Sequence, residues 1–150
     1  MNNRLLVSLS PHEKSDLSIE KMMWGVVIAL APAFLASVYF FGFHALRVVV
    51  FGMVFCFAVE YLTQKFITKK PITAFDGSAA VTGLLLAFNV HSSIPWWQLL
   101  AGSIVAIGVA KMTFGGLFQN PFNPALIGRA FMLASFPVAM TSWPVPLVNT

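Results

Sequence analysis

Residues 22–43 form an uninterrupted apolar stretch without a single charged side chain. As a helix rising about 1.5 Å per residue, this stretch would be about 33 Å long, which matches a bilayer hydrocarbon core about 30 Å thick. Only 9% of all residues are charged and 58% are hydrophobic, whereas about a quarter of a typical soluble domain is charged. So little charge cannot cover a water-facing surface. The sequence therefore predicts an all-α integral membrane protein.

The charge and the cysteine content exclude several functional classes. The net charge is +4, but the lysines lie in the N-terminal tail and at segment ends rather than along one face with stacking aromatics, which argues against a nucleic-acid partner. Cys56 is the only cysteine, so an internal disulfide is impossible and a thiolate-bound metal is unsupported. We interpret Cys56 as a packing residue.

The chain divides into a water-exposed tail, residues 1–21, and a membrane domain, residues 22–150. The tail carries six charged residues and lacks the apolar core of a cleavable signal peptide. In the membrane domain we expect about five helical segments, some short or broken: residues 22–43, 45–62, 79–90, 94–110 and 125–140. Residues 79–90 are too short for a full crossing, which suits a half-length segment lined by protein.

The loop at residues 63–78 indicates how these segments are oriented in the membrane. It carries Lys65, Lys69 and Lys70, and lysines beside a span mark the cytoplasmic side. Two spans separate this loop from the N-terminus, so we expect the N-terminus to be cytoplasmic as well.

Small residues recur at every fourth position of the fourth segment, at Gly102, Ala106 and Ala110. Such a ridge permits close helix contact. We expect that contact within this chain, with dimerisation as the alternative.

The stretch at residues 111–130 differs from everything around it. Gly115 and Gly116 end a helix, and Pro121 follows an asparagine, as Pro124 does. Proline removes a backbone donor and excludes its predecessor from the α region. We therefore predict a helix that begins at Pro124 with Asn123 as its N-cap. Irregular backbone at membrane depth must be buried in protein or line a cavity.

Two interpretations of this stretch remain open. A helix N-terminus offers free N–H groups and partial positive charge, and the side chains of Gln119, Asn120 and Asn123 add neutral donors and acceptors. This chemistry suits a heteroaromatic ligand such as a flavin ring, or a small amide such as urea. Alternatively, the asparagines satisfy only backbone groups at a structural helix break.

Charges within the predicted spans need partners. Arg129 lies about one and a half turns into the last segment, and Asp76 or a ligand anion is its expected counter-charge. Glu60 is expected to reach the interface or to pair with Lys65. Asp76 or Ser78 is the expected N-cap of the short third segment.

Several motifs in the chain closely resemble the D subunits of Rnf ion-translocating electron-transport complexes and, more weakly, the B subunits of sodium-pumping NADH:quinone reductases. The resemblance covers nearly the whole chain and is most specific in its last third. The motifs that carry it are DGSAAVTGLLLA at 76–87, PWW at 95–97, FGGLFQNPFNPA at 114–125, GRAF at 128–131 and SFP at 135–137.

The resemblance implies a fold and a function. Members of this family are multi-pass proteins of the bacterial inner membrane with about ten spans, built as two inverted halves of a urea-transporter-like fold. They sit with other subunits, in membrane lipid, in a complex that moves electrons between reduced ferredoxin and NAD, coupled to sodium or proton transport. By this resemblance the chain corresponds to an N-terminal half. The alternative function is half of a channel or carrier for a small polar solute such as urea.

The resemblance also implies cofactors. In the quinone-reductase relatives, the two asparagines of an Asn-x-x-Asn-Pro pattern contact riboflavin, and these positions are Asn120 and Asn123 here. We add Gln119 and Arg129 as candidate flavin-binding residues. The family attaches FMN to the threonine of a Ser-Gly-Ala-Thr type motif, which this sequence lacks.

Overall fold

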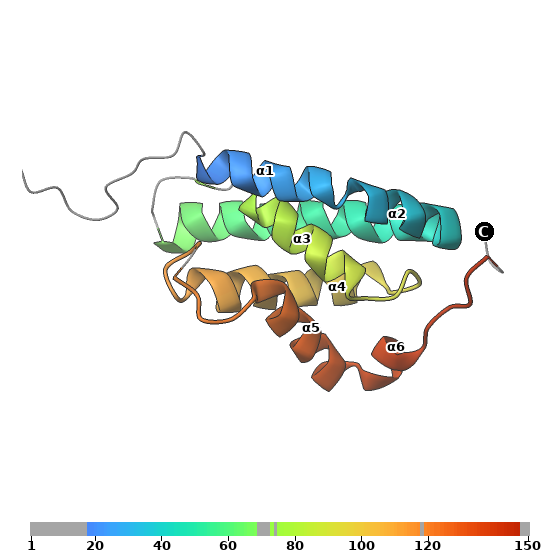
Figure 1. Ribbon diagram of the computed structural model, residues 1–150. Coiled ribbons are helices and arrows are strands. Elements are labelled where there is room, and N and C mark those ends of the chain that lie inside the picture. Colours follow the sequence, from blue (N-terminus) through green and yellow to red (C-terminus); the bar gives the residue numbers. More distant parts are fainter. Residues whose placement is uncertain (1–17, 69–72, 74, 118, 148–150) are drawn as a thin grey trace, which may run out of the picture.

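The computed structural model describes residues 18–68, 73, 75–117 and 119–147, and every regular element within these ranges is a helix (Figure 1). This confirms the prediction of an all-α protein. Most of the predicted tail, residues 1–17, lies outside the described residues. The remaining part of the tail already enters the first helix, α1 (Ile19–Ala29), whose N-cap Ser18 accepts a hydrogen bond from the backbone N of Lys21.

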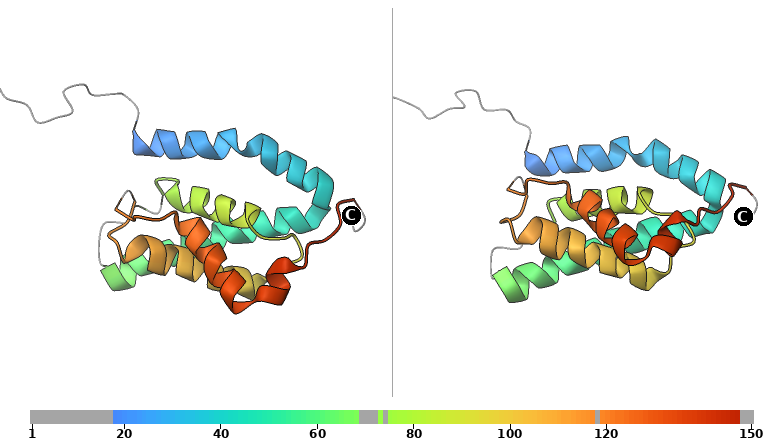
Figure 2. Two further views of the ribbon diagram at one scale, coloured as in Figure 1. Left: turned by 60° about the horizontal axis from the view of Figure 1, so that its bottom comes forward. Right: turned by 90° about the horizontal axis from the view of Figure 1, so that it is seen from below.

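Two antiparallel rods form the first half of the fold. Helix α1 continues into α2 (Ala31–Leu62), and the chain reverses inside α2 at Gly42 (Figure 2). Gly42 has a φ of 62° and a ψ of −148°, a conformation that is open to glycine because it lacks a Cβ. The helical run Ile19–Thr68 has the length and apolar composition needed to cross a membrane.

The third predicted segment is indeed short. After the π-helical turn η1 (Thr63–Thr68), helix α3 (Ser78–Phe88) has 11 residues, or about 16 Å, roughly half the thickness of a hydrocarbon core. Helix α4 (Trp96–Ser103) then runs without a break into the π-helical η2 (Ile104–Met112).

The last predicted segment, residues 125–140, is wrong as a single helix. The structure divides it into α5 (Pro124–Ser135) and α6 (Pro137–Thr141). The break falls at Phe136, with a φ of −132° and a ψ of 57°, because the proline that follows it excludes the helical conformation.

Glycines allow the helices to approach closely. A Cβ added to Gly83 of α3 would lie 2.6 Å from the carbonyl oxygen of Gly52 in α2. In the same way, a Cβ on Gly128 of α5 would lie 2.8 Å from the carbonyl oxygen of Gly102 and 2.9 Å from the Cβ of Ala106. The small-residue ridge of the fourth segment therefore packs inside this chain, as expected.

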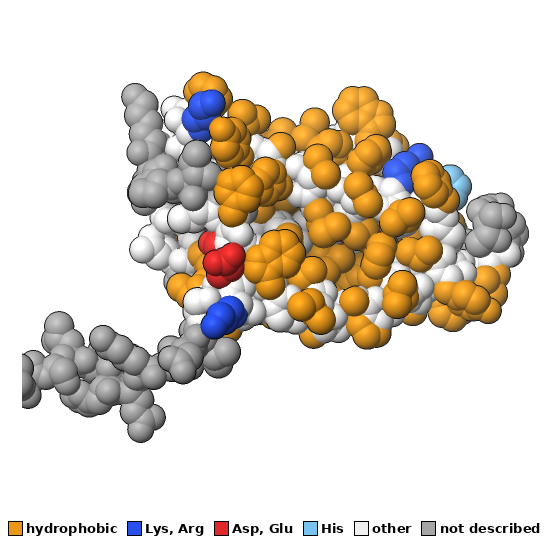
Figure 3. Space-filling view, turned by 90° about the horizontal axis from the view of Figure 1, so that it is seen from above, with side chains coloured by type: hydrophobic (Ala, Val, Ile, Leu, Met, Phe, Trp, Pro, Cys, Tyr) orange, Lys and Arg blue, Asp and Glu red, His pale blue; other side chains and the backbone are white. Residues whose placement is uncertain are grey.

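The surface matches a protein that lipid surrounds. Large side chains such as Ile28, Leu35 and Phe43 are about 70% exposed. On the face formed by α1 and α2, hydrophobic side chains cover the middle and charged ones gather at the two ends (Figure 3). An apolar band of this extent indicates membrane contact. We conclude that the chain is a membrane protein.

Candidate functional site

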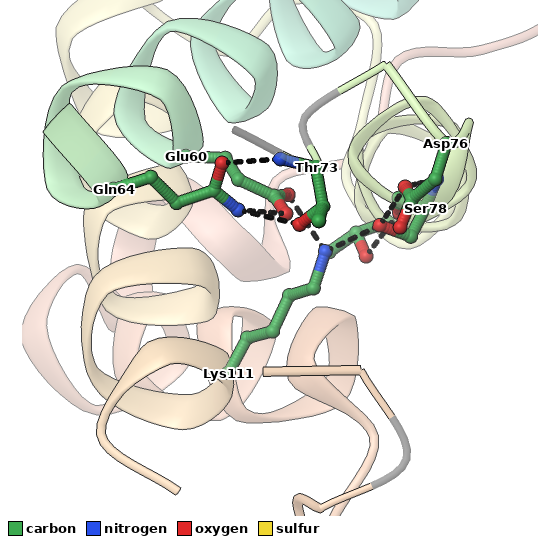
Figure 4. A network of polar contacts seen from close by, with 7 residues as sticks. Glu60, Gln64, Thr73, Asp76, Ser78 and Lys111 are labelled. Carbon is green, nitrogen blue, oxygen red and sulfur yellow. Dashed lines mark hydrogen bonds and ion pairs between the residues drawn. The ribbon is translucent and has the colours of Figure 1, made fainter. Parts of the chain in front are cut away.

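A buried ion pair links two helices near one end of the bundle. The Nζ of Lys111, at the end of η2, donates to the Oε2 of Glu60 in α2 at 2.6 Å (Figure 4). The two residues are only 2% and 1% exposed. The Nζ of Lys111 also donates to the Oγ of Ser78, the first residue of α3, at 2.6 Å. One ammonium group therefore connects three helical elements that lie far apart in the sequence.

Hydrogen bonds extend this pair on both sides (Figure 4). On the α3 side, the Oδ1 of Asp76 accepts from the backbone N of Ser78 at 2.9 Å and from its Oγ at 2.5 Å. On the η1 side, the Nε2 of Gln64 donates to the Oε1 of Glu60 at 3.1 Å and to the Oγ1 of Thr73 at 2.9 Å. Asp76 thus holds the first turn of α3, although the N-cap position itself is Gly77, with a φ of 84°.

Stability alone does not explain an ion pair at this position. Removing two charges from water is costly, and replacing a buried pair by well-packed apolar residues is often neutral or stabilising, by about 1–4 kcal/mol. An ammonium and a carboxylate that stay buried here suggest a use for the charge itself.

The predicted pairing of Glu60 with Lys65 is wrong. Lys65 is exposed, and its Nζ lies 5.6 Å from the ring centroid of Tyr61 and 5.5 Å from that of Phe66. In the sequence, Lys111 is one of the lysines that lie at segment ends. The signal that could have found the true pair is that Glu60 and Lys111 each lie near the end of a span on the same predicted side of the membrane.

A pocket of about 450 Å³ adjoins the ion pair; we call it the loop pocket. Its apolar walls include Val81, Leu85 and Phe122. Its volume lies in the range of roughly 300–1,000 Å³ that is common for small-molecule sites. The polar side chains that line it are those of Ser78, Thr82, Lys111, Asn120 and Asn123.

The loop beside this pocket has the predicted architecture. Gly115 and Gly116 follow η2 with φ values of 109° and 110°, and the backbone N of Gly116 donates to the carbonyl oxygen of Lys111 at 3.1 Å. Helix α5 begins at Pro124, and the Oδ1 of Asn123 accepts from the backbone N of Ala125 at 3.0 Å. The predicted N-cap is therefore confirmed.

Both asparagines also serve the backbone. The cap engages the carbonyl end of the Asn123 side chain, whereas the Nδ2 of Asn120 donates to the carbonyl oxygen of Phe122 at 2.6 Å. An asparagine amide has two donor hydrogens and two acceptor lone pairs. Each side chain therefore keeps hydrogen-bonding capacity beyond its structural bond, and the two interpretations of this loop are compatible.

The other two candidate residues lie elsewhere. The side chain of Gln119 lies against Gly115, where an added Cβ would collide with its Oε1, and Gln119 is not among the described lining residues of the loop pocket. Arg129 donates from Nη1 to the Oδ1 of Asn89 at 2.9 Å. The predicted pairing of Arg129 with Asp76 is wrong, because Asn89 follows the last residue of α3 whereas Asp76 precedes its first.

A second polar feature lies at the opposite end of α3. His91, in the turn before α4, is 5% exposed, and neither ring nitrogen forms a hydrogen bond of normal geometry with the described residues. Its ring lies 6.1 Å from that of Trp143, edge to face. Burial lowers the pKa of His91, an effect that the backbone of Ala139 partly offsets.

Comparisons with known proteins agree on one family. The family described as NQR2, RnfD, RnfE matches residues 6–148. The D subunit of a proton-translocating ferredoxin:NAD(+) oxidoreductase complex from Clostridium ljungdahlii is 48% identical over 141 residues, covering 94% of this chain and 42% of that protein. Its sodium-translocating counterpart from Acetobacterium woodii is 48% identical over 147 residues, covering 97% and 46%.

A more distant relative gives the same result. The D subunit of an ion-translocating oxidoreductase complex from Yersinia pseudotuberculosis is 39% identical over 148 residues, covering 96% of this chain and 42% of that protein. The chain thus spans less than half the length of each of these three relatives.

Proposed function

Because the chain belongs to the NQR2, RnfD, RnfE family, we propose that it forms part of a membrane subunit of an ion-translocating oxidoreductase complex. The relatives' names supply the reaction class, electron transfer between ferredoxin and NAD, and name either protons or sodium as the coupling ion. The partners would be the other subunits of that complex and the surrounding lipid.

We propose further that the chain is one inverted-repeat half of a urea-transporter-like fold in a bacterial inner membrane, with a cytoplasmic N-terminus. The short helix α3 and the helix α5 both follow a polar break, and the loop pocket lies where the two begin. Paired broken helices that begin together are a common way to build a transporter site. The described lysines all belong to this end, in α1, η1 and η2, which supports its cytoplasmic assignment.

Within that complex, we propose that the loop pocket holds a non-covalent flavin, with riboflavin as the candidate. The observation that carries this proposal is that one pocket gathers both asparagine amides and a buried ammonium between apolar walls. Such residues fit an isoalloxazine ring, whose faces are apolar and whose edge carries carbonyls and ring nitrogens. A covalent FMN would belong to the threonine motif that this sequence does not contain.

Each residue has a distinct part in this proposal. A bound flavin would supply the redox chemistry, and the protein would supply orientation and electrostatics. The amides of Asn120 and Asn123 would fix the polar edge of the ring, and Val81, Leu85 and Phe122 would contact its faces. The N-terminus of α5 would add partial positive charge, but no free backbone donor, because Pro124 lacks an N–H and the next three N–H groups are bound to Asn123.

The Asn123→Ser substitution tests this proposal in the full-length subunit, purified within its complex. Serine is as good an N-cap as asparagine, so the bond to Ala125 survives while the amide NH₂ is lost. We expect the thermal stability to be retained and the content of extractable riboflavin to fall at least severalfold. Gln119→Leu is the matched control, because that amide does not line the pocket.

The proposal fails if riboflavin remains at one equivalent in Asn123→Ser and in Asn120→Leu while both variants are folded. The loop asparagines would then serve only the backbone. Covalently bound FMN, measured after denaturation, should be unchanged in every variant and reports that the rest of the subunit is intact.

A further inference from the structure

We propose that Lys111 sets the reduction potential of the flavin in the loop pocket, an inference that rests on the function proposed above. Lys111 is 2% exposed, so its charge is not spread into bulk water. Its side chain lines the same pocket as Asn120 and Asn123, whereas Glu60 is not among the described lining residues. The lysine, rather than the carboxylate, is therefore the member of the ion pair that borders the proposed ligand.

The network around Lys111 holds this charge in place. Two acceptors, the Oε2 of Glu60 and the Oγ of Ser78, each bind the Nζ at 2.6 Å. Ser78 is held in turn by Asp76, and Glu60 by Gln64. An ammonium fixed by charge-assisted bonds cannot swing away to solvent, so it acts as a preorganised charge at the pocket wall.

Reduction changes the charge of the flavin, so a fixed charge beside it changes the reduction potential. Two electrons, supplied one at a time by a low-potential carrier of the ferredoxin class, and one proton from solvent would leave a net charge of −1 on the ring system. A nearby ammonium stabilises that charge more than it stabilises the neutral oxidised ring, and so raises the potential. The carboxylate of Glu60, behind the ammonium, acts in the opposite direction.

The test is the direction in which removing each charge shifts the midpoint potential of the flavin. In the full-length subunit within its complex, Lys111→Met should lower the midpoint potential of the non-covalent flavin, and Glu60→Gln should raise it. For a charge several ångströms away in a partly buried site, we expect about a tenfold or larger change in the oxidised-to-reduced ratio at a fixed potential. Tenfold corresponds to about 30 mV for a two-electron couple.

The readout is a spectroelectrochemical titration of the visible flavin bands. Subtracting the titration of Asn123→Ser, whose content of non-covalent flavin should be at least severalfold lower, isolates most of the signal of that flavin. Lys65→Met is the matched control, because it removes the same charge from the same end of the bundle at an exposed position. Its midpoint potential should equal that of the wild type.

The inference is overturned if Lys111→Met and Glu60→Gln shift the potential in the same direction, or if neither shifts it, while the flavin is present. It is supported only if Lys111→Met lowers the potential and Glu60→Gln raises it, and any other result with the flavin present overturns it. If Lys111→Met does not accumulate, the double variant with Glu60→Gln takes its place and must titrate below Glu60→Gln alone. Wild-type protein without any extractable flavin would instead refute the proposed function, so the two failures are distinguishable.

Discussion

Replacing Gly83 by alanine should separate α2 from α3, whereas the same replacement at Gly25 should stabilise the protein. At Gly83 the new Cβ would lie 2.6 Å and 2.8 Å from the carbonyl oxygen and carbon of Gly52, and 2.7 Å from the Cα of Met53. All three neighbours are backbone atoms, so no side chain can rotate away. At Gly25, in the interior of α1, a Cβ would meet nothing within 4 Å.

The expected change in the free energy of unfolding is the sum of two opposing contributions. Alanine is better than glycine in a helix interior by about 1 kcal/mol, and this gain applies at both positions. Overpacking costs about 1–3 kcal/mol, and the rigid backbone neighbours of Gly83 place its cost at the upper end. We therefore expect Gly83→Ala to destabilise by about 2 kcal/mol and Gly25→Ala to stabilise by about 1 kcal/mol.

The assay is equilibrium unfolding of the detergent-purified protein, followed by tryptophan fluorescence. The two variants differ by one methyl group each from the same wild type, so their difference of about 3 kcal/mol isolates the helix contact. If Gly83→Ala proves as stable as Gly25→Ala, then α2 and α3 do not cross at Gly52 and Gly83, and the packing described here is incorrect.

Two further predictions concern buried polar groups. Burial lowers the pKa of His91, so the folded state binds a proton there less readily than the unfolded state, in which the pKa is near 6.5. The contribution of His91 to stability should therefore be full above that pH and fall as the pH drops below it. Replacing the group by His91→Phe should flatten the acid limb of a plot of melting temperature against pH. Lys111→Met should destabilise by about 3–5 kcal/mol, because it leaves the Glu60 carboxylate buried without a counter-charge. The double variant Lys111→Met with Glu60→Gln should recover most of the lost stability in the same unfolding assay. If the double variant is as unstable as Lys111→Met alone, the aliphatic stem of the lysine, not its charge, holds the helices together.

Local chemistry explains which parts of the fold were predictable. The start of α5 depends on Asn123 and Pro124 alone, and the turn after η2 depends on Gly115 and Gly116; neighbouring residues decide both, so both were predicted. The half length of α3 follows from the polar residues that flank a short apolar run. The break at Phe136 was also visible in principle, since Pro137 follows it.

The charged partners were not predictable in the same way. Glu60 and Lys111 are 51 residues apart, and nothing in the composition of either segment says which helices will become neighbours. Lys65 is closer to Glu60 in sequence, but it lies beyond the end of α2, in the π-helical turn η1, and it contacts aromatic rings instead. Arg129 likewise binds Asn89 rather than Asp76, because its partner depends on how α5 crosses α3.

The reversal at Gly42 fixes how the second rod is rotated about its own axis relative to the first. The chain turns there within the helical run, with no loop to absorb a change in length. Since each helical residue advances by about 100°, one residue inserted after Gly42 would rotate the second rod by more than a quarter turn against the first. Val49, Cys56 and Glu60, now in the core, would swing away from it. The number of residues at this turn therefore decides whether the ion pair can form at all.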